Sequence, residues 1–184
     1  LPWSGEALNE ALAMLARLYE AIESAETMGG QEKPEDVAKS LGDDAQSVLD
    51  LGRSFQNRMH KALDEDFNTS AVLGHAFELA RAINRFSNHK KSKKRGGPIV
   101  QEALAGLRLV QPAIGLLGAD VSEFQQEVKE KCLRALGLSA QNIETQLNLR
   151  QQARSDKDWV KSDQIRDELD AQGILIMDTP QGVE

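Results

Sequence analysis

Apolar residues recur every three or four positions over most of the chain, which is the period of one face of an α-helix. We predict helical segments over Ser4 to Gly29, Pro34–Leu41 (a short turn or ordered loop), about Asp43–Leu63, from Thr69 onward, and about Ile99–Leu117. Ser4 and Thr69 are good N-cap residues. Pro112 lies inside the last pattern, so we expect a kink or an early end there. Four long amphipathic helices with short connections predict an antiparallel bundle.

The pattern changes towards the C-terminus. A further helix and connector is expected over Val121–Leu138, followed by short helices at about Gln141–Arg154 and Asp156–Ala171. The apolar run Ile174–Met177 predicts a strand, and turn residues after it predict a hairpin. The predicted fold class is therefore mostly α, with a helical bundle over residues 1–136 and a small α+β module of two short helices and a β-hairpin over residues 141–184.

Composition narrows the possible functions. The 184 residues carry 22 basic and 29 acidic side chains, a net charge of −7, which does not favour a general nucleic-acid binder. Cys132 is the single cysteine, so an intrachain disulfide framework and a multi-thiolate zinc site are excluded. We expect Cys132 to be a small buried apolar residue. No membrane span or signal peptide is predicted.

The common catalytic templates are absent. The sequence has no GxSxG, no glycine-rich phosphate loop and no HExxH, so neither catalytic nor metal-binding residues are predicted. The histidines are widely spaced, and we expect surface or hydrogen-bonded helix positions for all three: His60, His75 and His89. The acidic cluster Asp64–Asp66 could hold a cation, but such clusters more often cap helices.

One tract has a strong local charge. No Asp or Glu lies between Leu79 and Gln101. The tract carries seven basic residues: Arg81, Arg85, Lys90, Lys91, Lys93, Lys94 and Arg95. Composition alone favours a solvated, mobile loop, and a basic tract can also contact phosphates.

The second short helix near the C-terminus has an unusual face. Ile165 and Leu169 define its core side, whereas Trp159, Asp163 and Arg166 fall within about 60° of one another on a flank that the core does not need. An indole, a carboxylate and a guanidinium suit the recognition of unpaired bases by stacking and hydrogen bonds. The alternative is that the indole packs between the helices while the charged groups pair within the module.

Two segments carry a family resemblance. They are Leu63-Asp64-Glu65-Asp66-Phe67-Asn68-Thr69, and Arg150-x-x-Ala153-Arg154-x-x-Lys157-Asp158-Trp159 followed by Ser162-Asp163-x-Ile165-Arg166-Asp167-Glu168-Leu169 and Asp178-Thr179-Pro180-Gln181-Gly182. They resemble the helical domain and the C-terminal end of bacterial cysteinyl-tRNA synthetases. The resemblance implies a DALR-type, anticodon-binding helical bundle followed by a small anticodon-binding domain.

The resemblance also implies roles for residues. Arg154 and Asp163 would hydrogen-bond the first anticodon base, a guanine, Trp159 would stack on an anticodon base, and Asp178 would accept a hydrogen bond from another base. Candidates of lower rank are Arg150 and Arg166 at the anticodon and Lys90, Lys91, Lys93, Lys94 and Arg95 on the tRNA backbone.

The same resemblance implies a parent enzyme. That enzyme is a cytoplasmic, ATP-dependent ligase that attaches cysteine to tRNA(Cys). Its ATP site and its zinc site lie in a catalytic domain absent from this sequence, so the fragment alone is expected to be inactive, monomeric and without a cofactor. Two alternatives remain: the helical domain of a mycothiol-type cysteine ligase, which needs no anticodon reader, and a structural helical module that binds a protein through an exposed apolar patch.

Overall fold

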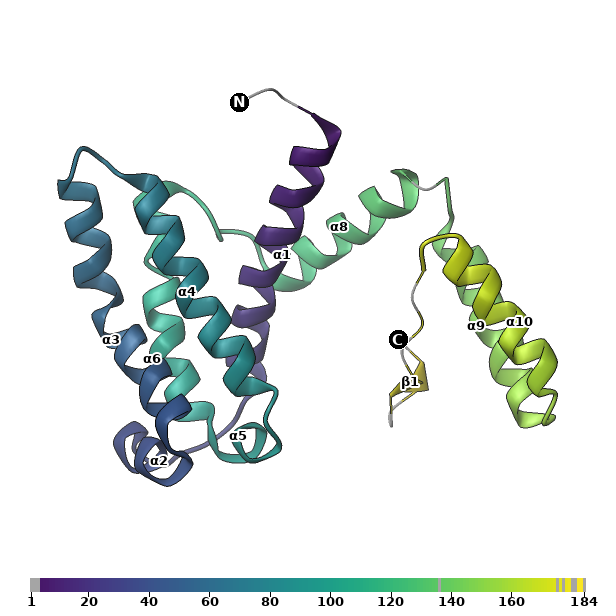
Figure 1. The fold of residues 1–184 in the computed structure, drawn as a ribbon, viewed down its shortest axis with the longest axis horizontal. Helices are drawn as coiled ribbons and strands as arrows, with labels where there is room; N and C mark the ends of the chain where they lie inside the picture. Colours follow the sequence, from purple (N-terminus) through teal and green to yellow (C-terminus); the bar gives the residue numbers. More distant parts are fainter. Residues whose placement is uncertain (1–3, 136, 175, 177, 180–181, 184) are drawn as a thin grey trace. The chain divides into compact units, whose positions relative to one another are not determined.

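The computed structural model describes residues 4–135, 137–174, 176, 178–179 and 182–183. The chain forms two compact units, residues 1–124 and 125–184, and each is considered by itself (Figure 1). The division falls inside one helix, α8 (Val121–Ala135). The sequence-based boundary at residues 136–141 stays a prediction.

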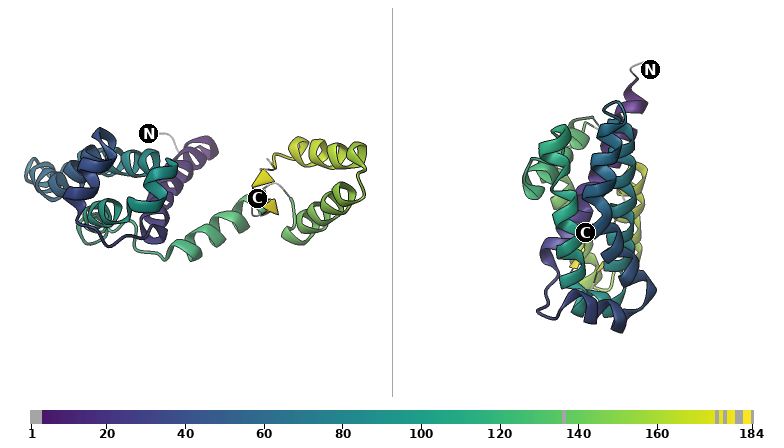
Figure 2. Two further views of the ribbon diagram at one scale, coloured as in Figure 1. Left: turned by 90° about the horizontal axis from the view of Figure 1, so that it is seen from below. Right: turned by 90° about the vertical axis from the view of Figure 1, so that its left-hand side faces the viewer.

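The first unit is a helical bundle, as the periodicity predicted. Its long helices are α1 (Gly5–Thr27), α3 (Asp43–Asp64), α4 (Thr69–Ser87) and α6 (Gly97–Leu107), and its short ones are α2 (Pro34–Leu41), α5 (Lys90–Arg95) and α7 (Val110–Ile114). The helix α3 packs against α4 and α6, and α1 packs against α4 and α6 in turn, so the four long helices lie side by side (Figure 2). Fully buried side chains from all four fill the space between them, among them Leu18, Phe55, Ile83 and Leu104.

The helix starts follow from local hydrogen bonding. The Ser4 hydroxyl accepts from the Ala7 N–H at 3.1 Å, as predicted for an N-cap. The cap of α4 is Asn68 rather than the predicted Thr69: its side-chain oxygen accepts from the Ala71 N–H at 3.0 Å. The prediction was off by one residue because Asn and Thr both cap well.

The helix predicted over 99–117 is interrupted. It ends at Leu107, and α7 begins at Val110. Pro112 has no N–H to donate to the carbonyl four residues earlier, and its ring crowds that carbonyl. The helix therefore breaks before the proline, which agrees with the early end predicted from the sequence.

The start of α8 is attached to the bundle by aromatic packing. The rings of Tyr19 and Phe124 stack with centroids 3.9 Å apart and planes 11° apart. The Ala119 N–H donates to the Tyr19 hydroxyl at 3.3 Å. Because both contacts precede Gln125, they belong to the bundle unit and fix the first turn of α8 to α1.

The second unit contains the helix pair α9 (Ala140–Ser155) and α10 (Trp159–Ala171), which pack on each other. A small core of Ile165, Leu169 and Ile176 holds the pair and the chain after it together. Strands β1 (Asp178–Thr179) and β2 (Gly182–Val183) pair in antiparallel fashion, with Asp178 opposite Val183.

The predicted α+β class of this module is wrong. Ile174 and Ile176 are not in a strand, and Leu175 and Met177 lie outside the described residues. The pairing that exists involves two residues on each side, and so short a hairpin forms no sheet layer. Ile176 is instead buried against α10, because the apolar run serves the core of a helix pair. The described part of the chain is therefore helical in class.

A second correction concerns Cys132, which is exposed rather than buried. Its helix, α8, contributes no buried residue to either unit, so an apolar position there meets solvent. Among the helices of the described residues, none has the length and apolar character that a membrane crossing requires.

Candidate nucleic-acid interface

The turn between α9 and α10 places the candidate base-reading residues. The Asp158 N–H donates to the Ala153 carbonyl at 2.8 Å, and Lys157 takes the left-handed conformation with φ of 60°, which closes α9 in the manner usual for glycine. The Asp158 carboxylate then caps α10 by accepting from the Lys161 N–H at 3.1 Å. Trp159 is consequently the first residue of α10.

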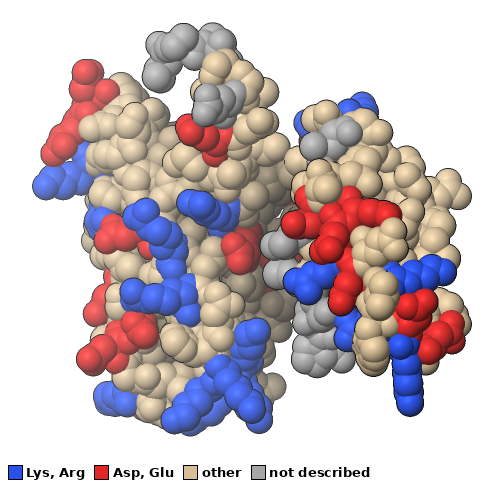
Figure 3. All heavy atoms as spheres, turned by 45° about the vertical axis from the view of Figure 1, so that its right-hand side comes forward, with Lys and Arg blue, Asp and Glu red and all other residues tan. Residues whose placement is uncertain are grey.

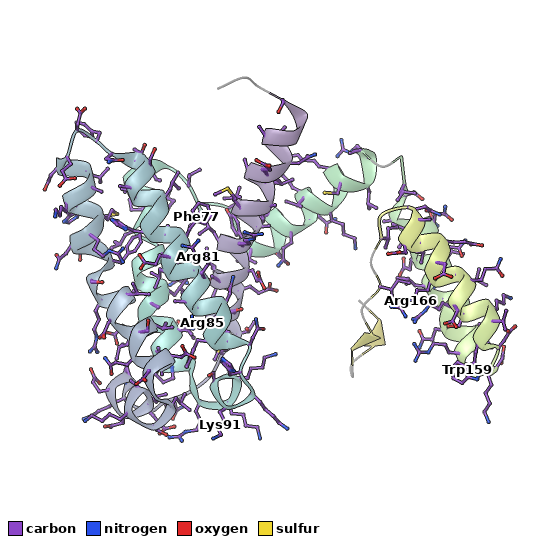
Figure 4. The ribbon with its side chains drawn as sticks, viewed as in Figure 1. Phe77, Arg81, Arg85, Lys91, Trp159 and Arg166 are labelled. Atoms are coloured by element: carbon purple, nitrogen blue, oxygen red, sulfur yellow. The ribbon has the colours of Figure 1, made fainter. Side chains whose placement is uncertain are left out.

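Three candidates share an exposed face of α10, as the spacing predicted. Trp159 has 57% of its surface exposed, and Asp163 and Arg166 are exposed one and two turns later. Figure 4 shows Trp159 at one end of α10 and Arg166 near the middle of the same helix. The alternative, in which the indole packs between the two helices, is therefore wrong. The interface between α9 and α10 instead buries Ala153, Ser162 and Ile165.

A hollow adjoins this face. Asp163, Arg166, Asp167, Asp170 and Ile176 surround a space of ≈ 490 Å³. Asp163 and Arg166 thus meet at one concave site, where a carboxylate accepts and a guanidinium donates. Such a pair can hydrogen-bond the edge of a base that Trp159 does not cover.

The remaining anticodon candidates fall in different environments. Arg154 is exposed in the last turn of α9. Arg150 is buried, with 3% of its surface exposed, so the structure does not bring it to the surface that carries Trp159. Asp178 lies in β1 opposite Val183, and its side chain lies outside the described residues.

Sequence reasoning did not single out Lys157. This exposed lysine precedes the cap of α10 and holds a backbone conformation that a non-glycine residue rarely adopts. No sequence signal identifies a left-handed lysine, because the conformation is imposed by the α9–α10 turn rather than by residue type.

The basic tract is a helix rather than the mobile loop that composition favoured. Lys90–Arg95 form α5, which is held by the buried Ser92. Arg95 is paired on the surface of the bundle: its guanidinium pairs with Glu32 at 2.7 Å and donates to the Ser40 hydroxyl at 3.0 Å. Within the described ranges, no ion pair involves the exposed side chains of Lys90, Lys91, Lys93 and Lys94. Lys and Arg side chains gather on one face of the bundle unit (Figure 3).

The histidines and the acidic cluster form no further site. Arg58 donates to His75 Nδ1 at 2.8 Å and pairs with Glu78. Burial disfavours the charged imidazolium, and the Arg58 charge repels it, so the pKa of His75 lies below its usual value. In the described part of the chain, no group of three or more His, Cys, Asp or Glu side chains could hold a metal ion.

Two family models match the chain. The first is the DALR domain, over residues 58–117, which includes all of α4, α5, α6 and α7. The second is the cysteinyl-tRNA ligase anticodon binding domain, over residues 137–184, and it contains the helix pair with Trp159, Asp163 and Arg166.

Curated relatives agree with both matches. The chain is 33% identical over 189 residues to the cysteine–tRNA ligase of Syntrophotalea carbinolica, covering 99% of this chain and 36% of that protein. It is 34% identical over 180 residues to that of Nitratidesulfovibrio vulgaris strain DP4, covering 96% of this chain and 36% of that protein. The chain thus spans little more than a third of these relatives' length. It belongs to the cysteinyl-tRNA ligase family, of which it carries the DALR and anticodon-binding domains.

Proposed function

We propose that this chain is the tRNA-recognition region of an enzyme that ligates cysteine to tRNA(Cys), and that α10 reads the anticodon. The observation that carries the proposal is the exposed indole of Trp159 beside Asp163 and Arg166, within the segment that matches an anticodon-binding domain. The helix pair has its own aliphatic core, so these three side chains are available to a ligand.

The chemistry of the three side chains suits splayed bases. Trp159 offers a flat face for stacking. Asp163 can accept the imino and amino protons of a guanine at the first anticodon position, and Arg154 or Arg166 can donate to its acceptors. Asp178 remains a proposed contact to another base. Arg150, being buried, supports the helix pair in this scheme.

The bundle would hold the base-reading unit and contact the RNA backbone through Lys90, Lys91, Lys93 and Lys94, while Arg95 serves the packing of α5 through Glu32 and Ser40. ATP and zinc would act in the part of the parent enzyme that this chain does not span, so ligation is proposed for the parent and not for the fragment. A monomeric, cytoplasmic protein fits the same proposal.

The test is a titration with a tRNA(Cys) anticodon stem–loop and with a loop whose first base is changed. Each lost stack or bidentate base contact costs about 1–3 kcal/mol, so Trp159→Ala and Asp163→Ala should weaken cognate binding by roughly tenfold or more. Lys161→Ala is a matched control, because this exposed residue lies on the same helix outside the reading face. Equal binding of both loops by the parent chain and by the two variants would refute the assignment.

A mycothiol-type ligase gains no support from this region, because the anticodon-binding match covers the segment which such an enzyme does not need. A purely structural module predicts a contiguous apolar patch. The large exposed apolar side chains are instead spread over different elements, from Leu8 and Phe67 to Leu149 and Val160.

A further inference from the structure

A second surface lies in the bundle, in a groove between α1 and α4. Its volume is ≈ 460 Å³. The lining residues are Met14, Arg17 and Glu20 from α1, Gly74, Phe77, Ala80, Arg81 and Asn84 from α4, and Asn88 after it. None of these residues belongs to the base-reading face of α10 or to the α5 lysines, so the groove is a separate feature of the chain.

The α4 side of the groove is a straight stripe. At 100° per residue, Gly74, Phe77, Arg81, Asn84 and Asn88 fall within an arc of about 80°. Figure 4 shows Phe77, Arg81 and Arg85 following one another along α4 towards Lys91 of α5. The stripe therefore leads from an aromatic edge, through a guanidinium, to the basic residues of α5.

The arginines of the groove differ from most others in the bundle. Arg53, Arg85 and Arg95 are each ion-paired to a carboxylate of another element. Arg17 and Arg81 are exposed, and among the described residues neither guanidinium group makes an ion pair or a hydrogen bond. Guanidinium groups left without a carboxylate are complementary to phosphate, which they can bind through two parallel hydrogen bonds.

The floor of the groove is fixed. The Asn84 amide donates to the Arg17 carbonyl at 3.1 Å and to the Glu20 carboxylate at 3.4 Å, which ties α1 to α4. Glu20 is the one carboxylate in the lining, and this hydrogen bond draws it towards Asn84. The two arginines are thereby carried by helices whose spacing is set before any ligand binds.

Gly74 gives an independent indication that the groove accommodates a ligand. Glycine disfavours a helix interior, yet a Cβ added at this position would meet nothing within 4 Å. Packing inside the protein therefore does not require the glycine. A residue without a side chain at the end of the groove permits close approach of a ligand backbone.

We propose that the α1–α4 groove binds the phosphate backbone of the tRNA outside the anticodon loop, with Arg17 and Arg81 as the phosphate ligands. The inference rests on the proposed RNA-binding role of the chain. It assigns contacts to a surface that carries no base-reading group, so these contacts add affinity without sequence preference.

The test compares the 184-residue chain, the double variant Arg17→Gln/Arg81→Gln, and the control Arg108→Gln/Arg134→Gln. The control removes two exposed arginines that already pair with Glu26 and Glu130, so both variants change the net charge equally. Each protein is titrated at two salt concentrations with a full tRNA(Cys) transcript and with its anticodon stem–loop.

We expect the groove variant to bind the transcript on the order of tenfold more weakly than the control, with a salt slope lower by about 1 for each arginine, and to bind the stem–loop unchanged. Equal transcript affinity and slope in the two variants would overturn the proposal, as would a parent chain that binds transcript no better than stem–loop. Polyglutamate serves as a third probe: if the groove variant loses binding to polyglutamate but not to the transcript, the proposal is overturned in favour of an acidic protein partner.

Together with the loop whose first anticodon base is changed, this experiment separates the inference from the proposed function. If changing the anticodon has no effect while the groove variant still loses transcript affinity, anticodon reading is refuted and the groove assignment stands. If changing the anticodon weakens binding and the groove variant binds the transcript as the control does, anticodon reading stands and the groove assignment is refuted.

Discussion

The packing of α3 on α6 depends on one glycine, and the effect of adding a methyl group there can be worked out from the structure. A Cβ built at Gly52 would lie 2.7 Å from the Ala103 Cα and 3.2 Å from the Ala103 Cβ. Carbon atoms pack favourably at about 3.5–4.0 Å, so Gly52→Ala forces the two helices apart by roughly 1 Å. The nearest atom belongs to the backbone, and no change of side-chain rotamer can relieve the contact.

Overpacking of this kind costs about 1–3 kcal/mol, and the better helix propensity of alanine returns about 0.5–1 kcal/mol. We therefore expect Gly52→Ala to lower the free energy of unfolding by roughly 1–2 kcal/mol. The assay is urea unfolding followed by far-UV circular dichroism, with hydrogen exchange of α3 amides to assign the loss to the bundle.

Gly74→Ala is the matched control, because α4 is also a long bundle helix and a Cβ there meets nothing within 4 Å. This variant should gain about 0.5–1 kcal/mol from propensity alone. A Gly52→Ala protein at least as stable as the parent would show that α3 and α6 are not in the close contact described.

Two further predictions concern the bundle. Phe124→Ala removes the stack on Tyr19, worth about 0.5–1.5 kcal/mol beyond buried area, and should speed hydrogen exchange in the first turn of α8 but not in α3; unchanged exchange would contradict the anchoring role. The pKa of His75 should lie below the usual value for histidine because of burial and the Arg58 charge, and Arg58→Gln should raise this pKa by removing the repelling charge; an NMR titration measures both. Because the folded-state pKa is lowered, this histidine contributes stability that is fully present above the unfolded pKa and is lost as pH falls below it.

The helical skeleton could be predicted from the sequence because apolar periodicity and strong caps agree. Ser4 and the stripe after it give α1, and the proline inside the fourth pattern signals the break before α7. The tail could not be predicted in the same way. An apolar run such as Ile174–Met177 suits a strand or a core connector equally well, and Ile176 is used as a core residue of the helix pair.

The face of α10 that we propose reads bases was predictable in part. The positions of Trp159, Asp163 and Arg166 follow from helix geometry alone, since Ile165 and Leu169 fix which side faces the core. Arg150 shows the limit of that reasoning: it shares the side of α9 that packs inward, and periodicity does not reveal how far a long side chain is buried. The left-handed Lys157 is set by tertiary structure and has no local signal.

Net charge is a poor guide to where this acidic chain can meet RNA, and the ion pairs explain why. Asp44, Glu32 and Glu35 each neutralise an arginine from a different helix, so these charges of both signs are used in holding the bundle together. The surface available to phosphate is then decided by which cations remain outside such pairs. Arg81 and Arg85 differ in this respect although they are one turn apart on α4, because only Arg85 faces a carboxylate of α3. Under the proposed function, the affinity for a tRNA(Cys) transcript should therefore respond to the loss of Arg81 far more than to the loss of Arg85, although the two substitutions change the net charge by the same amount.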